Sequence, residues 1–281
     1  MRAIGRTLFI TDLDGTLLSP EPAVTEKTAR VINSLTARGL SFTFATARSV
    51  YSAVPITSAL DISVPGILMN GVSIYDTAAE RYIDSRFIGP DASAEVLRAF
   101  ERHGVHCFMY RIEEENLICY YSALTTNVMR SFAEERKNSY KKPFVRLEHL
   151  SEKADGKVVY FTTTGPYEEL FPVKSEVEKI PGANHAFYLD VYNGAWYLEV
   201  FSHKASKAAG IDFLRERYGF ERVVAFGDNL NDLPMFSRAD IKVAVANARP
   251  EVIKAADFTA PPNTEDGVAE WLLENYSRYT D

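Results

Sequence analysis

The first third of the chain alternates short apolar runs with amphipathic stretches. Residues 7–11 (TLFIT) form an apolar, strand-like run. Helical spacing follows in VTEKTARVINSLTARG, with Thr25 as the candidate N-cap and Gly39 at the end. Apolar runs return in LSFTFATA and in PGILMN (65–70), with a predicted helix between them. Strands that alternate with helices predict βαβ units and a parallel sheet covered on both faces.

The middle of the chain shows paired strands instead. HCFMYRIEEENLICYY predicts two strands around a polar loop, and KVVYFTTT predicts another strand, followed by a stretch with helical spacing. HAFYLDVYNGAWYLEVF predicts a hairpin with Asn193-Gly194 at its turn. Antiparallel pairs interspersed with helices indicate an α+β module.

The alternating pattern resumes after about residue 201. A helix at about 206–218 leads to the strand RVVAFGD, and a further helix precedes the strand IKVAVA. The predicted fold class is α/β. We expect a discontinuous, Rossmann-like parallel-sheet core at 1–84 and 202–281, with the α+β module inserted at 85–201.

Composition and charge exclude several classes of function. The 281 residues are 46% apolar and 25% charged, which is typical of a globular protein. A net charge of −7 disfavours a nucleic-acid partner. The apolar runs are too short to span a membrane, and no signal-peptide pattern begins the chain. Cys107 and Cys119 lie on predicted neighbouring strands; a disulfide is open, but two buried thiols in the cytoplasm are favoured.

Four polar stretches follow predicted core strands, at the sheet edge where open α/β proteins bind ligands. The first is Asp12-Leu13-Asp14-Gly15-Thr16, and the second is GDNLND, which contains Asp228, Asn231 and Asp232. Taken singly, these are typical of a surface turn and a capped helix N-terminus. Several converging carboxylates repel one another unless a cation lies among them, and hard oxygen ligands suit Mg²⁺.

The other two stretches are suited to binding an anion. Thr46 in FATARS ends a predicted strand at the start of a helix, so its hydroxyl and the following amides can hold a phosphate. Lys204 and Lys207 in SHKASKAAG carry the positive charge that suits phosphate. In isolation, a capping threonine and a solvated basic turn are the commoner meanings of such residues.

Together the four stretches resemble the motif set of the haloacid dehalogenase-like (HAD) phosphatase superfamily. D-x-D-G-T is matched by Asp12, Asp14, Gly15 and Thr16, GDNLND matches the metal-binding motif, and Thr46 and Lys207 match the phosphate-binding positions. MNG (69–71), NARPEVIKAAD and NTEDGVAEWL look like the Cof-type subfamily with a C2-type cap (IIB). Ala47 and KASKA depart from that subfamily, which usually has Gly at the first position and GVSKG at the second.

The resemblance implies an Mg²⁺-dependent phosphatase that forms an aspartyl phosphate on a small phosphorylated metabolite, with sugar phosphates as the first expectation. Asp12 would be the nucleophile and Asp14 the general acid and base. Mg²⁺ would be held by Asp12, the backbone carbonyl of Asp14 and Asp228, and phosphate by Thr46 and Lys207. The module at 85–201 would act as a substrate-specificity lid. Supporting roles would fall to Gly15 in a tight turn, Thr16 near Asp14, Asp232 behind the metal or lysine, and Asn70 and Asn231 at the rim.

Two alternatives remain open at this point. A sugar-phosphate phosphotransferase or mutase would need arginines that grip a second phosphate, and five candidates in the inserted module are scattered: Arg98, Arg102, Arg111, Arg130 and Arg136. A catalytically silent sensor of a phosphorylated ligand would show damage at Asp12, Asp14 or Asp228, all of which are intact. A P-type ion pump, which shares the nucleophile chemistry, would need transmembrane helices.

Overall fold

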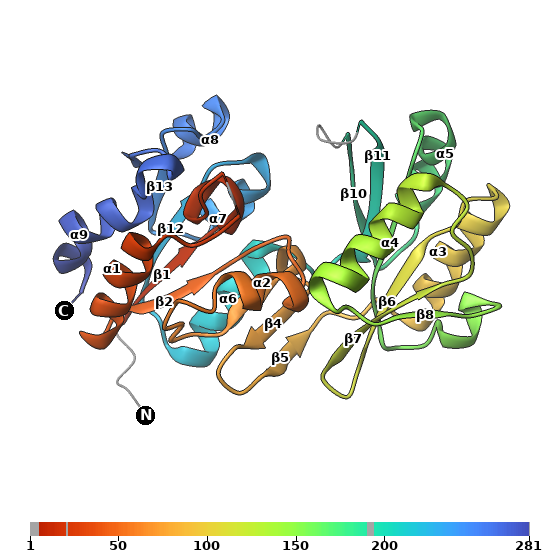
Figure 1. Cartoon of the computed structure of the whole chain (residues 1–281), viewed down its shortest axis with the longest axis horizontal. Helices are drawn as coiled ribbons and strands as arrows, with labels where there is room; N and C mark the ends of the chain where they lie inside the picture. Colours follow the sequence, from red (N-terminus) through yellow and green to blue (C-terminus); the bar gives the residue numbers. More distant parts are fainter. Residues whose placement is uncertain (1–5, 21, 190–193, 281) are drawn as a thin grey trace. The chain divides into compact units, whose positions relative to one another are not determined.

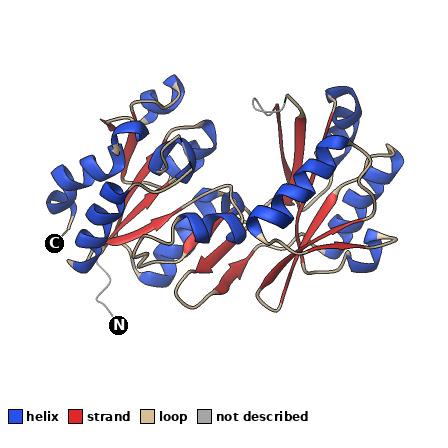
Figure 2. Ribbon diagram, viewed as in Figure 1, coloured by secondary structure: helices blue, strands red, loops and turns tan. Residues whose placement is uncertain are grey.

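The computed structural model describes residues 6–20, 22–189 and 194–280 (Figure 1). The chain folds into two compact units. Unit 1 comprises Met1–Asp84 and Ser206–Asp281, and unit 2 comprises Ser85–Ala205. Strands and helices occur in both units (Figure 2), and each unit has its own sheet or sheets and its own buried apolar side chains.

Unit 1 is built on a parallel sheet of five strands, in the order β14-β13-β12-β1-β2. Strand β1, which lies between β12 and β2, is buried along its whole length, because helices cover parallel sheets on both faces. Its register pairs Thr11 with Phe226 of β12 and with Phe44 of β2. This confirms the predicted parallel core. The strands are β1 (Thr7–Thr11), β2 (Ser41–Phe44), β12 (Arg222–Gly227), β13 (Ile241–Val245) and β14 (Phe258–Ala260).

The helices of unit 1 begin and end largely as their sequences predict. In α1, the side chain of Thr25 accepts a hydrogen bond from the Thr28 amide at 3.1 Å, which confirms the expected cap. Helix α9 packs beside α1, and its Trp271 meets Phe226 of the sheet edge-on at 5.2 Å. The helices are α1 (Glu26–Ala37), α2 (Val50–Ile56), α6 (Lys207–Tyr218), α7 (Leu233–Phe236), α8 (Pro250–Ala255) and α9 (Gly267–Tyr279).

A second, antiparallel sheet of three strands corrects one expectation for unit 1. The run PGILMN does form a strand, β3 (Gly66–Leu68), but it pairs antiparallel with β4 (Ser73–Asp76), which in turn is followed by β5 (Arg81–Ser85). One parallel bridge, between Ala45 and Ile67, links β3 to the end of β2. The chain reverses after β3 because the three residues Met69–Gly71 all have positive φ.

Unit 2 contains a mixed sheet of six strands, in the order β10-β11-β9-β6-β7-β8. The pairs β6–β7 and β10–β11 are antiparallel, as the two hairpin patterns predict. Asn193 of the predicted turn lies outside the described residues, and Gly194 has a φ of 68°. The strands are β6 (Phe108–Glu113), β7 (Asn116–Tyr121), β8 (Phe144–Arg146), β9 (Val158–Gly165), β10 (Ala183–Leu189) and β11 (Trp196–Ser202).

Alternation along the strands gives this sheet two different faces. Met109 and Phe161 point into an apolar cluster with residues of α3 and α5. Their neighbours point the other way, because successive strand side chains alternate. Phe108 stacks on Phe132 of α4 at 5.0 Å. The helices of unit 2 are α3 (Pro90–Arg102), α4 (Asn127–Tyr140) and α5 (Tyr167–Val177).

Two expectations from composition can be compared with the structure. Within the described residues, every helix is too short or too polar to cross a bilayer. Cys107 and Cys119 are buried free thiols, so the alternative of a disulfide was wrong. Burial raises the pKa of Cys119 to about 12 and raises that of Cys107 further, so both thiols stay protonated and unreactive at neutral pH.

Candidate active site

The carboxyl edge of the parallel sheet in unit 1 gathers three of the predicted stretches. Asp12 directly follows β1, and its amide donates a hydrogen bond to the carbonyl of Phe226 in β12 at 2.9 Å. Asp228 directly follows β12, and Thr46 lies two residues beyond β2. Because β1 lies between β12 and β2, these side chains belong to one edge of one sheet.

The fourth stretch supplies a buried lysine. Ser206 caps α6 by accepting a hydrogen bond from the Ala209 amide, which places Lys207 in the first turn. The Nζ of Lys207 lies 2.5 Å from Oδ1 of Asp12 and 2.7 Å from Oδ1 of Asp232. All three side chains are at most 8% exposed, so the ion pairs are shielded from solvent.

Asp232 is held firmly by its other oxygen. Its Oδ2 accepts hydrogen bonds from the backbone amides of Asp228 and Asn229, at 3.0 and 3.1 Å. With Lys207 on Oδ1, both oxygens of Asp232 are engaged by the protein itself. Asp232 therefore orients Lys207 and the turn that carries Asp228.

Burial sets the charge balance of this cluster. It raises the pKa of Asp12 well above the usual value, and the Lys207 ammonium acts in the opposite direction. The pKa of Lys207 is raised, because the two carboxylates outweigh its own burial. Burial raises the pKa of Asp228 to about 6, against a hydrogen bond from Thr16 that lowers it. Three carboxylates thus share one ammonium.

The turn after Asp12 packs directly against Asp228. Gly15 has a φ of 81°, and a Cβ at this position would lie 2.5 Å from Oδ2 of Asp228, so both its conformation and its size are required. The hydroxyl of Thr16 donates to Oδ1 of Asp228 at 2.8 Å. The Thr16 hydroxyl thus joins the turn that carries Asp14 to the second acidic stretch.

An arginine that the sequence interpretation did not single out holds Asp14. Nε and Nη2 of Arg48 donate to the two oxygens of Asp14 at 2.8 and 2.6 Å, a bidentate pair. Arg48 also donates its backbone amide to the hydroxyl of the fully buried Thr46 at 3.1 Å. The sequence feature that could have pointed to Arg48 is its place in FATARS, two residues after Thr46.

Two further expectations need correction or refinement. Thr46 does not begin a helix, because α2 starts at Val50 after Ser49, and the intervening residues form a turn. The side chain of Lys204 is exposed and that of Lys207 is buried in the cluster, so only Lys207 joins the site. Asn231 donates to Asn70 at 3.5 Å, which brings these two amides together.

The donor set fits a divalent cation. Within the described residues, one group of at least three metal-binding side chains converges: Asp12, Asp228 and Asp232, whose ligand atoms lie within 4.8 Å of one another. Since both oxygens of Asp232 are engaged, the carboxylates of Asp12 and Asp228 remain to hold a cation. Carboxylate oxygens of this kind fit a hard divalent ion.

Comparison with known proteins agrees with this site. Residues 9–272 match the haloacid dehalogenase-like hydrolase family. The 5-amino-6-(5-phospho-D-ribitylamino)uracil phosphatase YitU of Bacillus subtilis is 27% identical over 96% of this chain and 97% of its own. Two crystal structures are similar along nearly the whole length of both chains. TM0651 of Thermotoga maritima has a TM-score of 0.80 at 26% identity, covering 97% of each chain.

The second structure is the subclass IIB sugar phosphatase BT4131, with a TM-score of 0.69 at 25% identity, covering 95% of this chain and 98% of its own. The family match spans both the parallel-sheet core and the intervening unit. The acid-rich edge of the sheet, the buried lysine and the extent of this match lead to one assignment. The chain belongs to the haloacid dehalogenase-like hydrolases, and it is a Cof-type phosphatase.

Proposed function

We propose that this protein is an Mg²⁺-dependent phosphatase that hydrolyses phosphate monoesters of small metabolites through an aspartyl phosphate on Asp12. The observation that carries the proposal is the buried cluster in which Lys207 bridges Asp12 and Asp232, next to Asp228. A reactive carboxylate, a cation site and a fixed ammonium are the groups that phosphoryl transfer needs.

In the first step an oxygen of Asp12 attacks phosphorus, and the bond from phosphorus to the leaving oxygen breaks. Asp14 gives its proton to that oxygen, so an alcohol leaves. In the second step a water molecule attacks the phosphorus of the aspartyl phosphate while Asp14 takes its proton, which releases inorganic phosphate and restores Asp12. A divalent cation held by Asp12, Asp228 and the Asp14 carbonyl would supply positive charge against the phosphate.

The remaining groups of the site would bind the phosphate and orient the side chains around it. Lys207 and Thr46 would bind the non-bridging phosphate oxygens, where charge shifts during transfer. Asp232 would keep Lys207 in place through its 2.7 Å contact. Arg48, which pairs with both oxygens of Asp14, would hold the acid until a substrate phosphate competes for the guanidinium. Gly15 and Thr16 would keep Asp228 against the nucleophile's turn.

The substrate class rests on the similar proteins. The name of YitU specifies a phosphate on a ribityl chain, and that of BT4131 specifies a sugar. Both are phosphates on a polyhydroxylated carbon chain, so we expect sugar phosphates and related polyol phosphates to be the best substrates. Residues 85–201 would form the lid that selects among them, and the protein would act in the cytoplasm on these small molecules, without nucleic-acid or membrane partners.

The alternatives have weaker support. Five arginines of unit 2 that could grip a second phosphate engage nearby carboxylates, amides or carbonyls instead: Arg98 with Glu95, Arg102 with Glu176, Arg111 with Glu113 and Asp155, Arg130 with Asn127 and Leu124, and Arg136 with Glu135. A phosphotransferase or mutase would need such guanidiniums for a second phosphate. A silent sensor would not need the intact trio of Asp12, Asp14 and Asp228.

The test is phosphate release from a panel of sugar, polyol and nucleoside monophosphates, with Mg²⁺ and with chelator. Asp12→Asn should lower the rate at least about 10³-fold, because it removes the nucleophile. Asp212→Asn, at an exposed surface pair with Arg238, is the matched control and should retain full activity. Activity that survives Asp12→Asn would refute the covalent route, and activity indifferent to chelator would refute the metal.

A further inference from the structure

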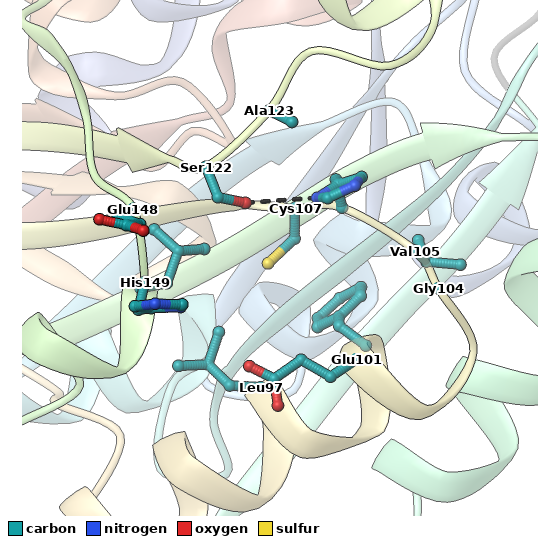
Figure 3. A pocket seen from close by; sticks show the side chains of 12 residues that line it. Leu97, Glu101, Gly104, Val105, Cys107, Ser122, Ala123, Glu148 and His149 are labelled. Atoms are coloured by element: carbon teal, nitrogen blue, oxygen red, sulfur yellow. Dashed lines mark hydrogen bonds between the residues drawn. The ribbon is translucent and has the colours of Figure 1, made fainter.

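Unit 2 contains a cavity of about 420 Å³ that the proposed chemistry does not use. It lies where the C-terminal half of α3 and the loop into β6 meet the end of β7 and the turn before Leu150 (Figure 3). Its volume is within the range of sites that bind small molecules. The lining residues are Leu97, Phe100, Glu101, Gly104, Val105, His106, Cys107, Ser122, Ala123, Glu148, His149 and Leu150.

The base of the cavity is apolar and firmly packed. Leu97, Phe100, Cys107 and Leu150 are each at most 8% exposed and belong to the apolar cluster of unit 2. Figure 3 shows the Cys107 thiol directed into the same space as the side chain of His149. These side chains are part of the core of unit 2, so the base of the cavity is a packed apolar surface.

The rim of the cavity is acidic. Glu101 on α3 and Glu148 after β8 both line it, and within the described part of the chain neither carboxylate is paired with a basic side chain. His106, in contrast, has a polar partner, since its Nδ1 lies 3.3 Å from the hydroxyl of Ser122. No lysine or arginine is among the lining residues, so the lining offers two carboxylates and no Lys or Arg cation to balance them.

Two classes of ligand are disfavoured by this lining. A phosphorylated metabolite would bring negative charge to two unpaired carboxylates. A metal ion would need at least three converging donors, and among the described residues such a group is found at Asp12, Asp228 and Asp232 rather than here. The class of ligand that remains is a molecule with a positively charged group on an apolar body.

We propose that this cavity is a binding site for a small organic cation, a primary ammonium group attached to an apolar or aromatic body. The ammonium binds at the rim that carries Glu101 and Glu148, and the imidazoles of His106 and His149 and the hydroxyl of Ser122 are further polar groups there. The body replaces water against Leu97, Phe100 and Leu150. This site is separate from the carboxylates of unit 1 and does not depend on the phosphatase proposal.

The test is a calorimetric titration of the full-length protein with phenethylamine at low ionic strength. Its neutral and anionic counterparts, 2-phenylethanol and phenylacetate, have a similar body and provide matched ligands. We expect saturable one-to-one binding of the amine, binding at least about tenfold weaker for the alcohol, and none for the acid. Equal binding of the amine and the alcohol, or no binding of the amine, would overturn the proposal.

Variants locate the binding within the molecule. Glu101→Gln and Glu148→Gln should each weaken phenethylamine binding about fivefold, the effect of losing a partly exposed ion pair. Glu95→Gln, which neutralises another carboxylate of α3 outside the cavity, is the control and should leave the affinity unchanged. All are surface substitutions, so their melting temperatures without ligand should equal that of the wild type. Affinity that is the same in all three variants would place the amine elsewhere and refute the site.

Discussion

At the scale of single residues, the site depends on one buried ammonium. Lys207 is 1% exposed and touches the carboxylates of Asp12 and Asp232, which are themselves 8% and 0% exposed. Ion pairs removed from water to this degree are costly to break, since the partners left behind stay charged and desolvated. Lys204, three residues earlier, is exposed and has no such role.

We therefore expect Lys207→Met to destabilise unit 1 by about 3 to 5 kcal/mol and to lower phosphate release at least about 100-fold. Lys204→Met should change either quantity little, because its ammonium stays in water. Urea unfolding and initial rates measured on both variants check this. A larger loss in activity at Lys204 than at Lys207 would show that the motif lysine was wrongly assigned.

The raised pKa of Asp228 gives a pH-dependent prediction. Without metal, the folded pKa is about 6, above the usual 3.8. Between these values the folded state keeps a proton that the unfolded state has lost, so stability falls as pH rises through this window and the whole penalty is present above about pH 6. Asp228→Asn removes the penalty because it carries no charge.

In chelator at pH 7.5, Asp228→Asn should therefore melt about 2 °C above the wild type, which corresponds to roughly 1 kcal/mol after allowance for partial exposure. The difference should shrink toward pH 4.5, where the wild-type carboxyl is protonated. Added Mg²⁺ should stabilise the wild type more than the variant. Thermal unfolding in both buffers is the measurement, with Asp212→Asn as the control. A variant that is less stable than the wild type in chelator at pH 7.5 would contradict the pKa argument.

At the scale of elements, the turn after β3 meets the start of α6. Met69, Asn70 and Gly71 have φ values of 50°, 55° and 96°, a conformation that side chains other than glycine adopt at a cost. A Cβ on Gly71 would lie 2.0 Å from the carbonyl oxygen of Ser206, the residue that caps α6 and precedes Lys207. A side chain at Gly71 would therefore displace Ser206 and, with it, the neighbouring Lys207.

Gly71→Ala should cost both stability and activity, because it combines a strained φ with a backbone clash that displaces Lys207. Gly39→Ala is a matched control: Gly39 also has a positive φ, 102°, but no atom lies within 4 Å of its would-be Cβ. We expect about 1 kcal/mol from strain at Gly39 with normal kcat, and a larger loss with kcat lowered at least about tenfold at Gly71. Equal kcat values for the two variants would show that the turn at Gly71 does not affect activity through the position of Lys207.

At the scale of the whole molecule, the division into units has a consequence for folding. Unit 2 is one continuous segment, Ser85–Ala205, and its apolar cluster is drawn from α3, α5, the central strands and their connections, all within that segment. Unit 1 is formed from two segments that are far apart in the chain, and its sheet is completed when β1 of the first segment pairs with β12 of the second.

A fragment of residues 85–205 should therefore fold alone, with a cooperative thermal transition and native-like circular dichroism. Residues 1–84 alone should not, because β1 would lack its neighbour β12 and the whole run of buried apolar residues in it would be exposed on one edge. A fragment 85–205 that stays unfolded would show that its core needs support from unit 1.

Much of this fold could be predicted from the pattern of apolar residues. The buried strands β1 and β12 are near-continuous apolar runs, α1 carries its cap at Thr25, and the hairpins of unit 2 are indicated by paired strand-like runs around polar turns. The place of β3 could not be predicted, because its pairing depends on three positive φ values that only Gly71 among the three residues signals.

What the sequence by itself determined is the chemistry at the strand ends. Asp12, Asp14, Thr46, Lys207 and Asp228 could be named because their four stretches together resemble the HAD motif set, and because parallel strands bring their carboxyl ends to one edge. What only the tertiary structure decided is which of these groups touch. Arg48 pairs with Asp14, and Thr16 pairs with Asp228. Lys207, rather than Lys204, contacts two carboxylates. These contacts join residues far apart in the chain, and they depend on packing that no local pattern encodes.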